Sequence, residues 1–353
     1  MARAQATLQR MLWRVPAMVL TIAVLHIVGW GIFLALVQPH QYIMDGGTAF
    51  FGTGLALTAY LLGARHAFDA DHIAAIDNTT RRLANSGRHS GSTGFWFALG
   101  HSSVVVVTVA LLSAGLNVLA GQLTDEGSAL KQFTSIWGPA ISGLFLLLIG
   151  TINLASLAGI RHAHQQLKCG TYDDAEFDEH LDRRGLLNRI VGPLSRRIDR
   201  PWKMYPLGVL FGLGFDTATT IGLFVVAGGA ALTLPWHAAM VLPLLFTAGM
   251  VLFDSLDGLL MSRVYMWAFQ QPARKILYNY IITAVSVTIA FVVAFIILGG
   301  LLTDLLHLDS GPVAWVASLN IENFGLIIVG LFTVAWITAK TLWHTRTKTD
   351  SKM

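Results

Sequence analysis

The chain has 353 residues, of which 54% are apolar and only 12% are charged. Soluble domains carry about 25% charged residues, so a soluble fold of this length could not cover so much apolar surface. The formal charge of +4 does not indicate a nucleic-acid partner, because the basic surplus of a membrane protein gathers in its cytoplasmic loops. The single cysteine, Cys169, excludes a disulfide framework and a zinc site built from cysteines. These features predict an integral membrane protein surrounded by a lipid bilayer.

Long apolar stretches predict eight transmembrane helices, because about 20 apolar residues cross the roughly 30 Å of hydrocarbon in a bilayer. The first stretch follows a basic N-terminal segment, but it is longer than the apolar core of a signal peptide, which has about 7–15 residues. We therefore expect it to be retained as a helix. The predicted spans are 18–37, 50–72, 94–115, 136–158, 206–232, 239–262, 279–303 and 319–340. The predicted fold class is an all-α integral membrane protein.

The distribution of Lys and Arg predicts that both termini lie in the cytoplasm. Cytoplasmic loops of membrane proteins are enriched in these residues. If the N-terminus is inside, only Lys131 falls in an outer loop and only Arg65 falls within a span, while all other Lys and Arg residues lie on the inner side. A missed or extra span would exchange the inner and outer sides of all later loops, so that Lys and Arg would fall on both sides of the membrane. We expect a multi-pass protein of the cytoplasmic (inner) membrane.

One long polar segment, 161–203, divides the chain into two halves. It mixes basic and acidic residues without a long apolar run, which predicts a cytoplasmic loop with some helix. The predicted organisation is an N-terminal half, 1–160, and a C-terminal half, 204–353, with four transmembrane helices each. We expect no ATPase domain, because the sequence has no Gly-rich phosphate loop ending in Lys-Ser/Thr.

The second predicted span ends in an unusual string of ionisable residues, RHAFDADHIAAIDNTTRR (65–82). One charged residue at the centre of a membrane helix costs about 2.5–3.5 kcal/mol on insertion and is a functional-site hypothesis by default. At 100° per residue in a straight helix, His66, Asp69 and His72 share an arc of about 120°. Two imidazoles and a carboxylate on one face predict a site for nickel, cobalt, zinc or copper.

Asp71 does not fit this face, because it lies about 140° from His66 in a straight helix. Either the helix is broken here, or Asp71 orients a neighbouring ligand or contacts a partner. The alternative for the whole string is that its residues only cap a helix end and pair with Arg65 and Arg81. The sequence leaves these interpretations open.

Ionisable groups in other spans lie at a similar predicted depth. His26, His101, Asp216 and Asp254 are about 7–10 residues from the cytoplasmic ends of their spans, or about 10–15 Å deep. A transport site between helices gathers such groups near one level. Taken alone, His26 is typical of a hydrogen-bonded core histidine. Asp216, and Asp254 with Asp257, favour function, because a buried carboxylate needs a partner.

The string RHAFDADHIAAIDN resembles the signature of the nickel/cobalt transporter family, the NiCoT permeases. The resemblance extends to LGHSSVVV (99–106), YPLGVLFGLGFDTAT (205–219) and FDSLDGLLM (253–261), so it covers nearly the whole chain. It implies high-affinity uptake of divalent nickel or cobalt as the transported substrate, through eight helices and without a resident cofactor. The family's ligands in this string fall on His66, Asp71 and His72, with Asp69 in the same string.

Three positions bear on transport rate and on the choice of metal in this resemblance. The family often has an acidic residue where this chain has Thr220, which puts rate or coupling in question more than metal binding. The family tunes nickel against cobalt through a residue of the first span and the apolar residue before the first motif aspartate. These are His26 and Phe68 here, a pairing that resembles members accepting both metals. The preferred metal, the coupling ion and the oligomeric state stay open.

Two function classes compete. The first is secondary import of a divalent metal, driven by a membrane potential worth about 2.3 kcal/mol per charge per 100 mV. The alternative is an intramembrane metalloenzyme that retains its metal. The zinc-protease string His-Glu-x-x-His is absent, and the chain has one histidine-rich string where di-iron membrane enzymes need several. The sequence favours a transporter over an enzyme.

Overall fold

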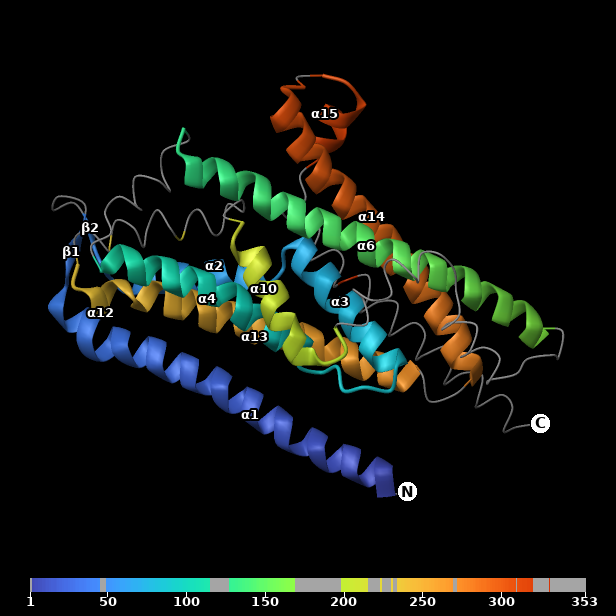
Figure 1. Ribbon diagram of the computed structural model, residues 1–353. Coiled ribbons are helices and arrows are strands. Elements are labelled where there is room, and N and C mark those ends of the chain that lie inside the picture. The colour runs from blue at the N-terminus through green and yellow to red at the C-terminus, as the bar shows by residue number, and fades with distance from the viewer. Residues whose placement is uncertain are drawn as a thin grey trace. The chain divides into compact units, whose positions relative to one another are not determined.

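The computed structural model describes residues 2–44, 49–114, 127–168, 198–214, 223, 230, 234–268, 272–308, 310–319 and 330. This part of the chain is helical, apart from one two-residue pairing in which Ile43 faces Phe50. The elements, shown in Figure 1, are α1 (Ala2–Ile32), η1 (Phe33–Val37), η2 (Gln38–His40), β1 (Ile43–Met44), β2 (Ala49–Phe50), α2 (Thr53–His66), α3 (Ala70–Asn85), α4 (Thr93–Ser113), α6 (Ala129–Lys168), η4 (Pro201–Lys203), α10 (Met204–Gly212), α12 (Trp236–Ala239), α13 (Val241–Ala268), α14 (Pro272–Leu306) and α15 (Pro312–Ala317). The predicted helical fold is confirmed for the described residues.

Five stretches of the described residues are long and apolar enough to cross a membrane. They coincide with the first, third, fourth, sixth and seventh predicted spans, with small shifts at their ends. Their bounds are Pro16–His40, Thr93–Ser113, Gln132–Leu154, Trp236–Met266 and Thr283–Leu306. The fifth and eighth predicted spans lie largely outside the described residues. The count of eight helices and the cytoplasmic termini stay predictions.

The second predicted span is not the continuous helix expected over 50–72. The helix α2 ends at His66, and Asp69 then adopts an extended conformation with φ −68° and ψ 142°. Helical hydrogen bonding restarts where the Ile73 amide donates to the Asp69 carbonyl at 3.2 Å. The helix is interrupted at Asp69. The arc of about 120° predicted for His66, Asp69 and His72 on a straight helix is therefore wrong.

The residues after the break form the helix α3, where the topology prediction placed an inner loop. Asp69 is the N-cap residue of α3 and Asp71 lies in its first turn, both of which favour a helix start. Arg81, which was predicted to lie in an inner loop, lies on α3 and is only 5% exposed. Burial of a guanidinium requires polar partners, which Thr283 and Asn78 provide.

The chain divides into two compact units, each built from segments that are distant in the sequence. The first comprises residues 1–68, 88–142 and 200–259, and the second comprises residues 69–87, 143–199 and 260–353. The predicted loop at 161–203 begins as a continuation of α6 to Lys168, and η4 starts at Pro201. Residues 169–197 lie outside the described part, so the domain boundaries stay a prediction.

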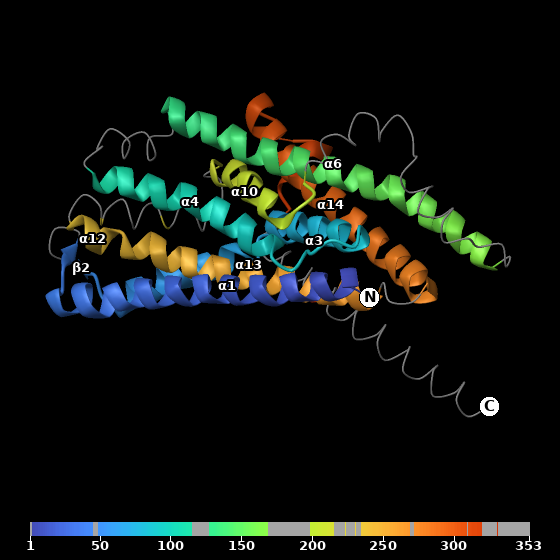
Figure 2. The same ribbon diagram turned by 60° about the horizontal axis from the view of Figure 1, so that its bottom comes forward.

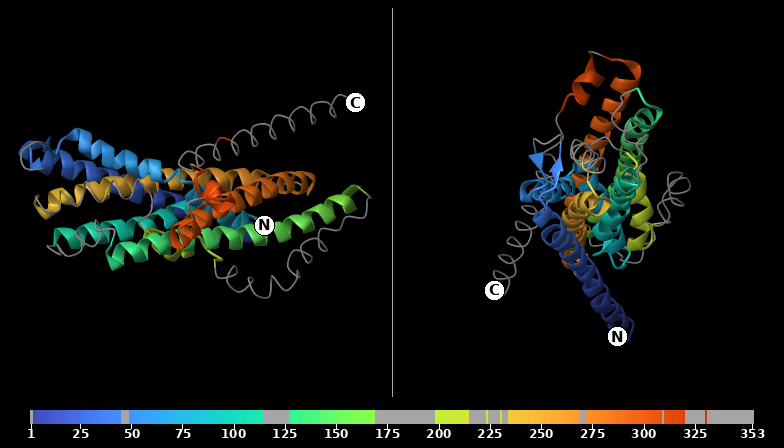
Figure 3. Two further views of the ribbon diagram at one scale, coloured as in Figure 1. Left: turned by 90° about the horizontal axis from the view of Figure 1, so that it is seen from above. Right: turned by 90° about the vertical axis from the view of Figure 1, so that its left-hand side faces the viewer.

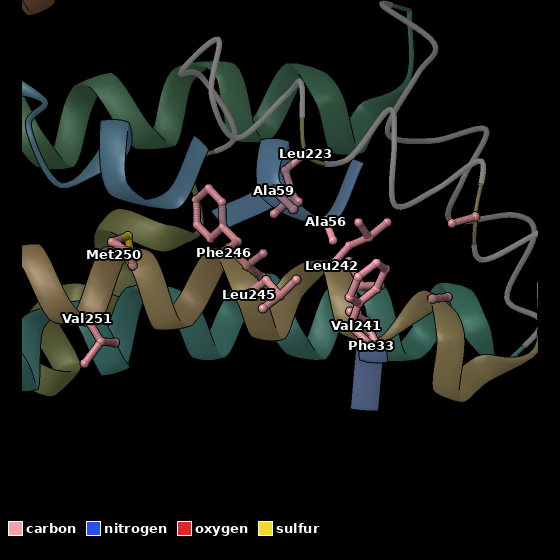
Figure 4. Packing of buried hydrophobic residues seen from close by; sticks show 14 of the residues in the cluster. Phe33, Ala56, Ala59, Leu223, Val241, Leu242, Leu245, Phe246, Met250 and Val251 are labelled. Carbon is pink, nitrogen blue, oxygen red and sulfur yellow. The ribbon is translucent and has the colours of Figure 1, made fainter. Parts of the chain in front are cut away.

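The hydrophobic core of the first unit gathers around α13 (Figure 4). Small residues of α2, Ala56 and Ala59, and the ring of Phe33 belong to the same buried cluster. Small side chains allow helix backbones to approach closely, as is common in membrane proteins. The fully buried core residues contributed by α13 are Val241, Leu242, Leu245, Phe246, Met250 and Val251.

Glycines bring helix backbones into direct contact on both sides of the candidate site. A Cβ atom on Gly63 of α2 would lie 2.0 Å from the Phe246 carbonyl oxygen of α13. A Cβ atom on Gly208 of α10 would lie 2.0 Å from the Phe97 carbonyl oxygen of α4. The helices α10 and α4 accordingly lie side by side in Figures 1 and 2. These contacts fix the end of α2 and the middle of α4.

In the second unit, α14 is the central packing partner. It contacts α3 and α15, and α15 lies beside its C-terminal end in Figure 3. A Cβ atom on Gly143 of α6 would lie 2.6 Å from Leu298 of α14, so these two helices are also closely packed. The helix α3 is therefore held in a unit that includes α14.

Two glycines of α2 provide a matched test of this packing. Gly63→Ala places a methyl group against backbone atoms that cannot move aside, whereas Gly54→Ala meets no atom within 4 Å. We expect Gly63→Ala to destabilise the protein by about 1–3 kcal/mol. Gly54→Ala should stabilise α2 slightly, by up to about 1 kcal/mol. Thermal unfolding of the detergent-solubilised variants measures both, and equal midpoints would contradict the close packing at Gly63.

Candidate metal centre

A pair of buried histidines lies where α2 and α4 meet. His66 is the last residue of α2, and His101 lies near the middle of α4. Their Nε2 atoms are 3.0 Å apart, and the ring centroids are 4.7 Å apart at an interplanar angle of 62°. His66 is 1% exposed and His101 is 3% exposed. The ring of Phe246 lies 5.7 Å from the His66 ring and adds an apolar wall.

The separation of the two nitrogens matches that of two ligands on one metal ion. Imidazole nitrogens bind zinc at about 2.0–2.1 Å, and similar bonds to one ion at an angle of about 90–110° place the nitrogens about 2.9–3.4 Å apart. The 3.0 Å between His66 Nε2 and His101 Nε2 falls in this range. In the absence of metal, one ring can donate a hydrogen bond to the other across the same distance. The two imidazoles are therefore already placed at a distance that suits binding of one metal ion.

His72 is the third histidine of the group, six residues after His66 and beyond the break. One ligand nitrogen from each of His66, His72 and His101 lies within 4.8 Å of the other two, and all three residues are buried. His72 is 1% exposed. Three convergent imidazoles make a donor set that suits zinc, copper, iron and nickel.

The ends of the broken helix affect a cation in opposite ways. The carbonyl end of α2, at His66, carries partial negative charge and favours a cation, whereas the amide end of α3 carries partial positive charge. Asp69 at the N-cap and Asp71 in the first turn place two carboxylates at that amide end. Broken membrane helices use such ends to bind ions in many transporters.

Asp71 has a defined local contact, which bears on the question left open by the sequence. Its Oδ1 atom accepts a hydrogen bond from the backbone amide of His72 at 2.9 Å. It is partly buried, as is Asp69. The carboxylate of Asp71 therefore holds the backbone of a histidine in the group, as a residue that orients a ligand would.

His26 has the contacts of the alternative interpretation, a hydrogen-bonded core histidine. Its Nδ1 donates to the Ile22 carbonyl at 2.8 Å, and its Nε2 lies 3.3 Å from the hydroxyl of Tyr60 on α2. The two rings meet edge to face with centroids 5.6 Å apart. The group of three convergent histidines does not include it.

The remaining candidate residues lie mainly on α13 or near it. Phe68, in the break, contacts Phe253 of α13 with ring centroids 5.4 Å apart. The next residue, Asp254, is fully buried, and Asp257 is partly buried one turn later. Asp216 and Thr220 lie outside the described residues, so their roles stay predictions.

A second buried polar cluster on α3 was not assigned from the sequence. It centres on Asp77, Asn78 and Arg81, which are 1%, 2% and 5% exposed. The spacing i, i+1, i+4 places these residues on one face of a helix, and that pattern was the available signal. It was missed because the segment was interpreted as a loop.

Comparison with known proteins finds relatives that are named as nickel transporters. The family model described as high-affinity nickel-transport protein, NicO, matches residues 52–342. The nickel transporter NicT of Mycobacterium tuberculosis is 45% identical over 94% of this chain and 89% of its own length. The high-affinity nickel-transport protein NixA of Helicobacter pylori is 39% identical over 88% of this chain and 95% of its own. No solved structure matches.

A relative named for another metal is nearly as similar. The cobalt transport protein NhlF of Rhodococcus rhodochrous is 35% identical over 94% of this chain and 92% of its own length. These relatives are named as transporters and not as enzymes, so they do not favour an enzyme that retains its metal. Together with several helices long enough to cross a membrane, they describe a multi-pass membrane protein. The chain belongs to the NicO family of high-affinity nickel-transport proteins.

Proposed function

We propose that this protein imports divalent nickel, cobalt or both across the cytoplasmic membrane as a secondary transporter. The observation that carries the proposal is the convergence of one nitrogen from each of the buried histidines His66, His72 and His101 within 4.8 Å. Buried polar groups in an apolar surround are costly unless they serve a partner, and three imidazoles in one place suit a borderline metal ion. Asp69 and Asp71 complete the proposed site.

The donor set suits a substrate that must be released as well as bound. Histidine nitrogens and carboxylate oxygens bind nickel and cobalt without the thiolate ligands that favour softer ions. The only cysteine, Cys169, is nearly a hundred residues from the histidine string. Release requires that the affinity differ between outward-facing and inward-facing states of the transporter.

The membrane potential supplies a driving force for import. A divalent cation entering a cell that is negative inside gains about 4.6 kcal/mol per 100 mV, which is twice the value for one charge. In this proposal eight helices cross the membrane and both termini lie in the cytoplasm, as the distribution of Lys and Arg predicts. Transport then needs no ATPase domain in this chain.

Removal of an imidazole tests the site directly. We expect His66→Ala and His72→Ala each to abolish uptake of radiolabelled nickel, because each removes one of three convergent ligands. His40→Ala is the matched control, since His40 is an exposed histidine on η2. Uptake is compared at equal amounts of protein in the membrane. Normal uptake by both His66→Ala and His72→Ala would contradict the assignment of the metal site.

Asp71 allows its charge to be separated from its hydrogen bond. Asp71→Asn keeps an acceptor for the His72 amide but removes the negative charge, whereas Asp71→Ala removes both. If the charge balances the bound cation, both variants should raise the nickel concentration for half-maximal uptake by about tenfold or more. Asp304→Asn, on the exposed side of α14, is the control. Wild-type behaviour of Asp71→Asn alone would show that Asp71 only caps the helix.

The choice of metal is tested by competition. Cells that express the protein take up radiolabelled nickel in the presence of unlabelled cobalt, and radiolabelled cobalt in the presence of unlabelled nickel. We expect each metal to inhibit uptake of the other, because both bind the same imidazoles. Inhibition in one direction only would indicate separate routes, and no uptake of either metal would contradict the proposed function.

A further inference from the structure

The buried polar cluster on α3 links this helix to the parts of three other helices that belong to the second unit. Its centre, Asp77, accepts two hydrogen bonds, one at each carboxylate oxygen. The Tyr265 hydroxyl of α13 donates to Oδ1, and the Ser286 hydroxyl of α14 donates to Oδ2 at 2.9 Å. Both donors are 1% exposed. The carboxylate therefore ties α3 to α13 and α14 at once.

Arg81 lies one turn after Asp77 and extends the cluster. Opposite charges at this spacing attract each other, so the guanidinium offsets the charge of the buried carboxylate. Its Nη1 donates to the Thr283 hydroxyl of α14, and its Nη2 donates to Asn78 Oδ1 at 3.3 Å. The Asn153 side chain of α6 also donates to Asn78 Oδ1. The cluster thus reaches α6, α13 and α14.

The break before α3 gives this cluster its importance. In a continuous helix, backbone hydrogen bonds would fix how α3 is turned relative to α2. Because Asp69 is extended, α2 does not set this rotation. Apolar contacts are non-directional, whereas hydrogen bonds to charged groups are directional and strong. The polar cluster therefore restrains the rotation of α3 about its own axis relative to α13 and α14.

The rotation of α3 decides where His72 points. His72 precedes Asp77 by five residues and lies about 140° away around the helix, so the cluster holds one face while His72 occupies another. A turn of about 20° moves a side-chain tip at a radius of about 5–6 Å by about 2 Å. A displacement of that size equals the length of a metal–nitrogen bond, which is about 2.0–2.1 Å for zinc.

We propose that the hydrogen bonds of Tyr265 and Ser286 to Asp77 position His72 for metal binding. These two are positioning residues that act through Asp77 and α3. The inference rests on the proposed function, since it assigns them to the same nickel or cobalt site. Tyr265 lies 193 positions after His72 in the sequence, so the link comes from the fold alone.

The test separates positioning from ordinary stabilisation. A residue that only stabilises the fold changes the amount of folded protein and hence the maximal rate of uptake. A residue that positions a ligand changes the nickel concentration for half-maximal uptake, because the proteins that do fold bind nickel less tightly. Tyr265→Phe removes one hydroxyl and retains the ring, so it disturbs packing little.

We expect Tyr265→Phe, purified and reconstituted in vesicles, to raise the nickel concentration for half-maximal uptake by about tenfold. The affinity for nickel, measured by direct titration of the detergent-solubilised protein, should fall by the same factor. Tyr280→Phe is the matched control, since Tyr280 is an exposed tyrosine of α14, and it should behave as wild type. Should Tyr265→Phe fail to fold, Ser286→Ala carries the same comparison.

A double variant tests the shared route through Asp77. Because both hydroxyls act on one carboxylate, the effects of Tyr265→Phe and Ser286→Ala on half-maximal uptake should not add. Unchanged half-maximal uptake in the single variants, with wild-type protein active, would overturn the positioning role and leave the proposed function standing. A wild-type protein that takes up no nickel would instead overturn the proposed function.

Discussion

An imidazole or a carboxylate in an apolar interior must have polar partners, and this requirement shapes the region around the break between α2 and α3. An unpaired buried polar group costs several kcal/mol, and a helix break adds backbone groups that need partners. Here the Asp71 carboxylate accepts a hydrogen bond from the His72 amide, and the Nε2 atoms of His66 and His101 lie 3.0 Å apart. Side chains at the break therefore both satisfy a backbone amide and bring buried imidazoles together.

The membrane-length helices could be predicted from the sequence, because the thickness of the bilayer sets the length of an apolar run. The position of Asp71 raised a break in this helix as one of two alternatives, but an average over about 20 residues could not locate one extended residue. The signals for a helix start were present in Asp69 and Asp71, but Asp69 was interpreted as a ligand on a straight helix and the role of Asp71 was left open. Because the predicted span ended at residue 72, Arg81 was assigned to a loop. Its partners lie on α14 and on α3 itself.

Depth along the helices predicted a set of candidates but could not rank them. His26 and His101 lie at similar predicted depths, yet His101 faces His66 while His26 contacts Tyr60. Depth is one coordinate, and rotation about the helix axis supplies the other. That rotation depends on packing, such as the contact of Gly208 with the Phe97 backbone one turn before His101. Tertiary contacts of this kind leave no periodic signal in the sequence.

Charge balance supports the proposal that the histidines and the aspartates form one site. Three neutral imidazoles can complete much of the coordination of a divalent ion, but they leave its two positive charges unbalanced in a buried place. Asp69 and Asp71, at the amide end of α3, lie in the same string as His66 and His72. Asp77 cannot share this task, because Arg81 and two hydroxyl groups already engage it. In the proposed site, the ten residues from Asp69 to Asn78 therefore carry carboxylates with two roles: Asp69 and Asp71 would balance the charge of the ion, and Asp77 binds side chains of neighbouring helices.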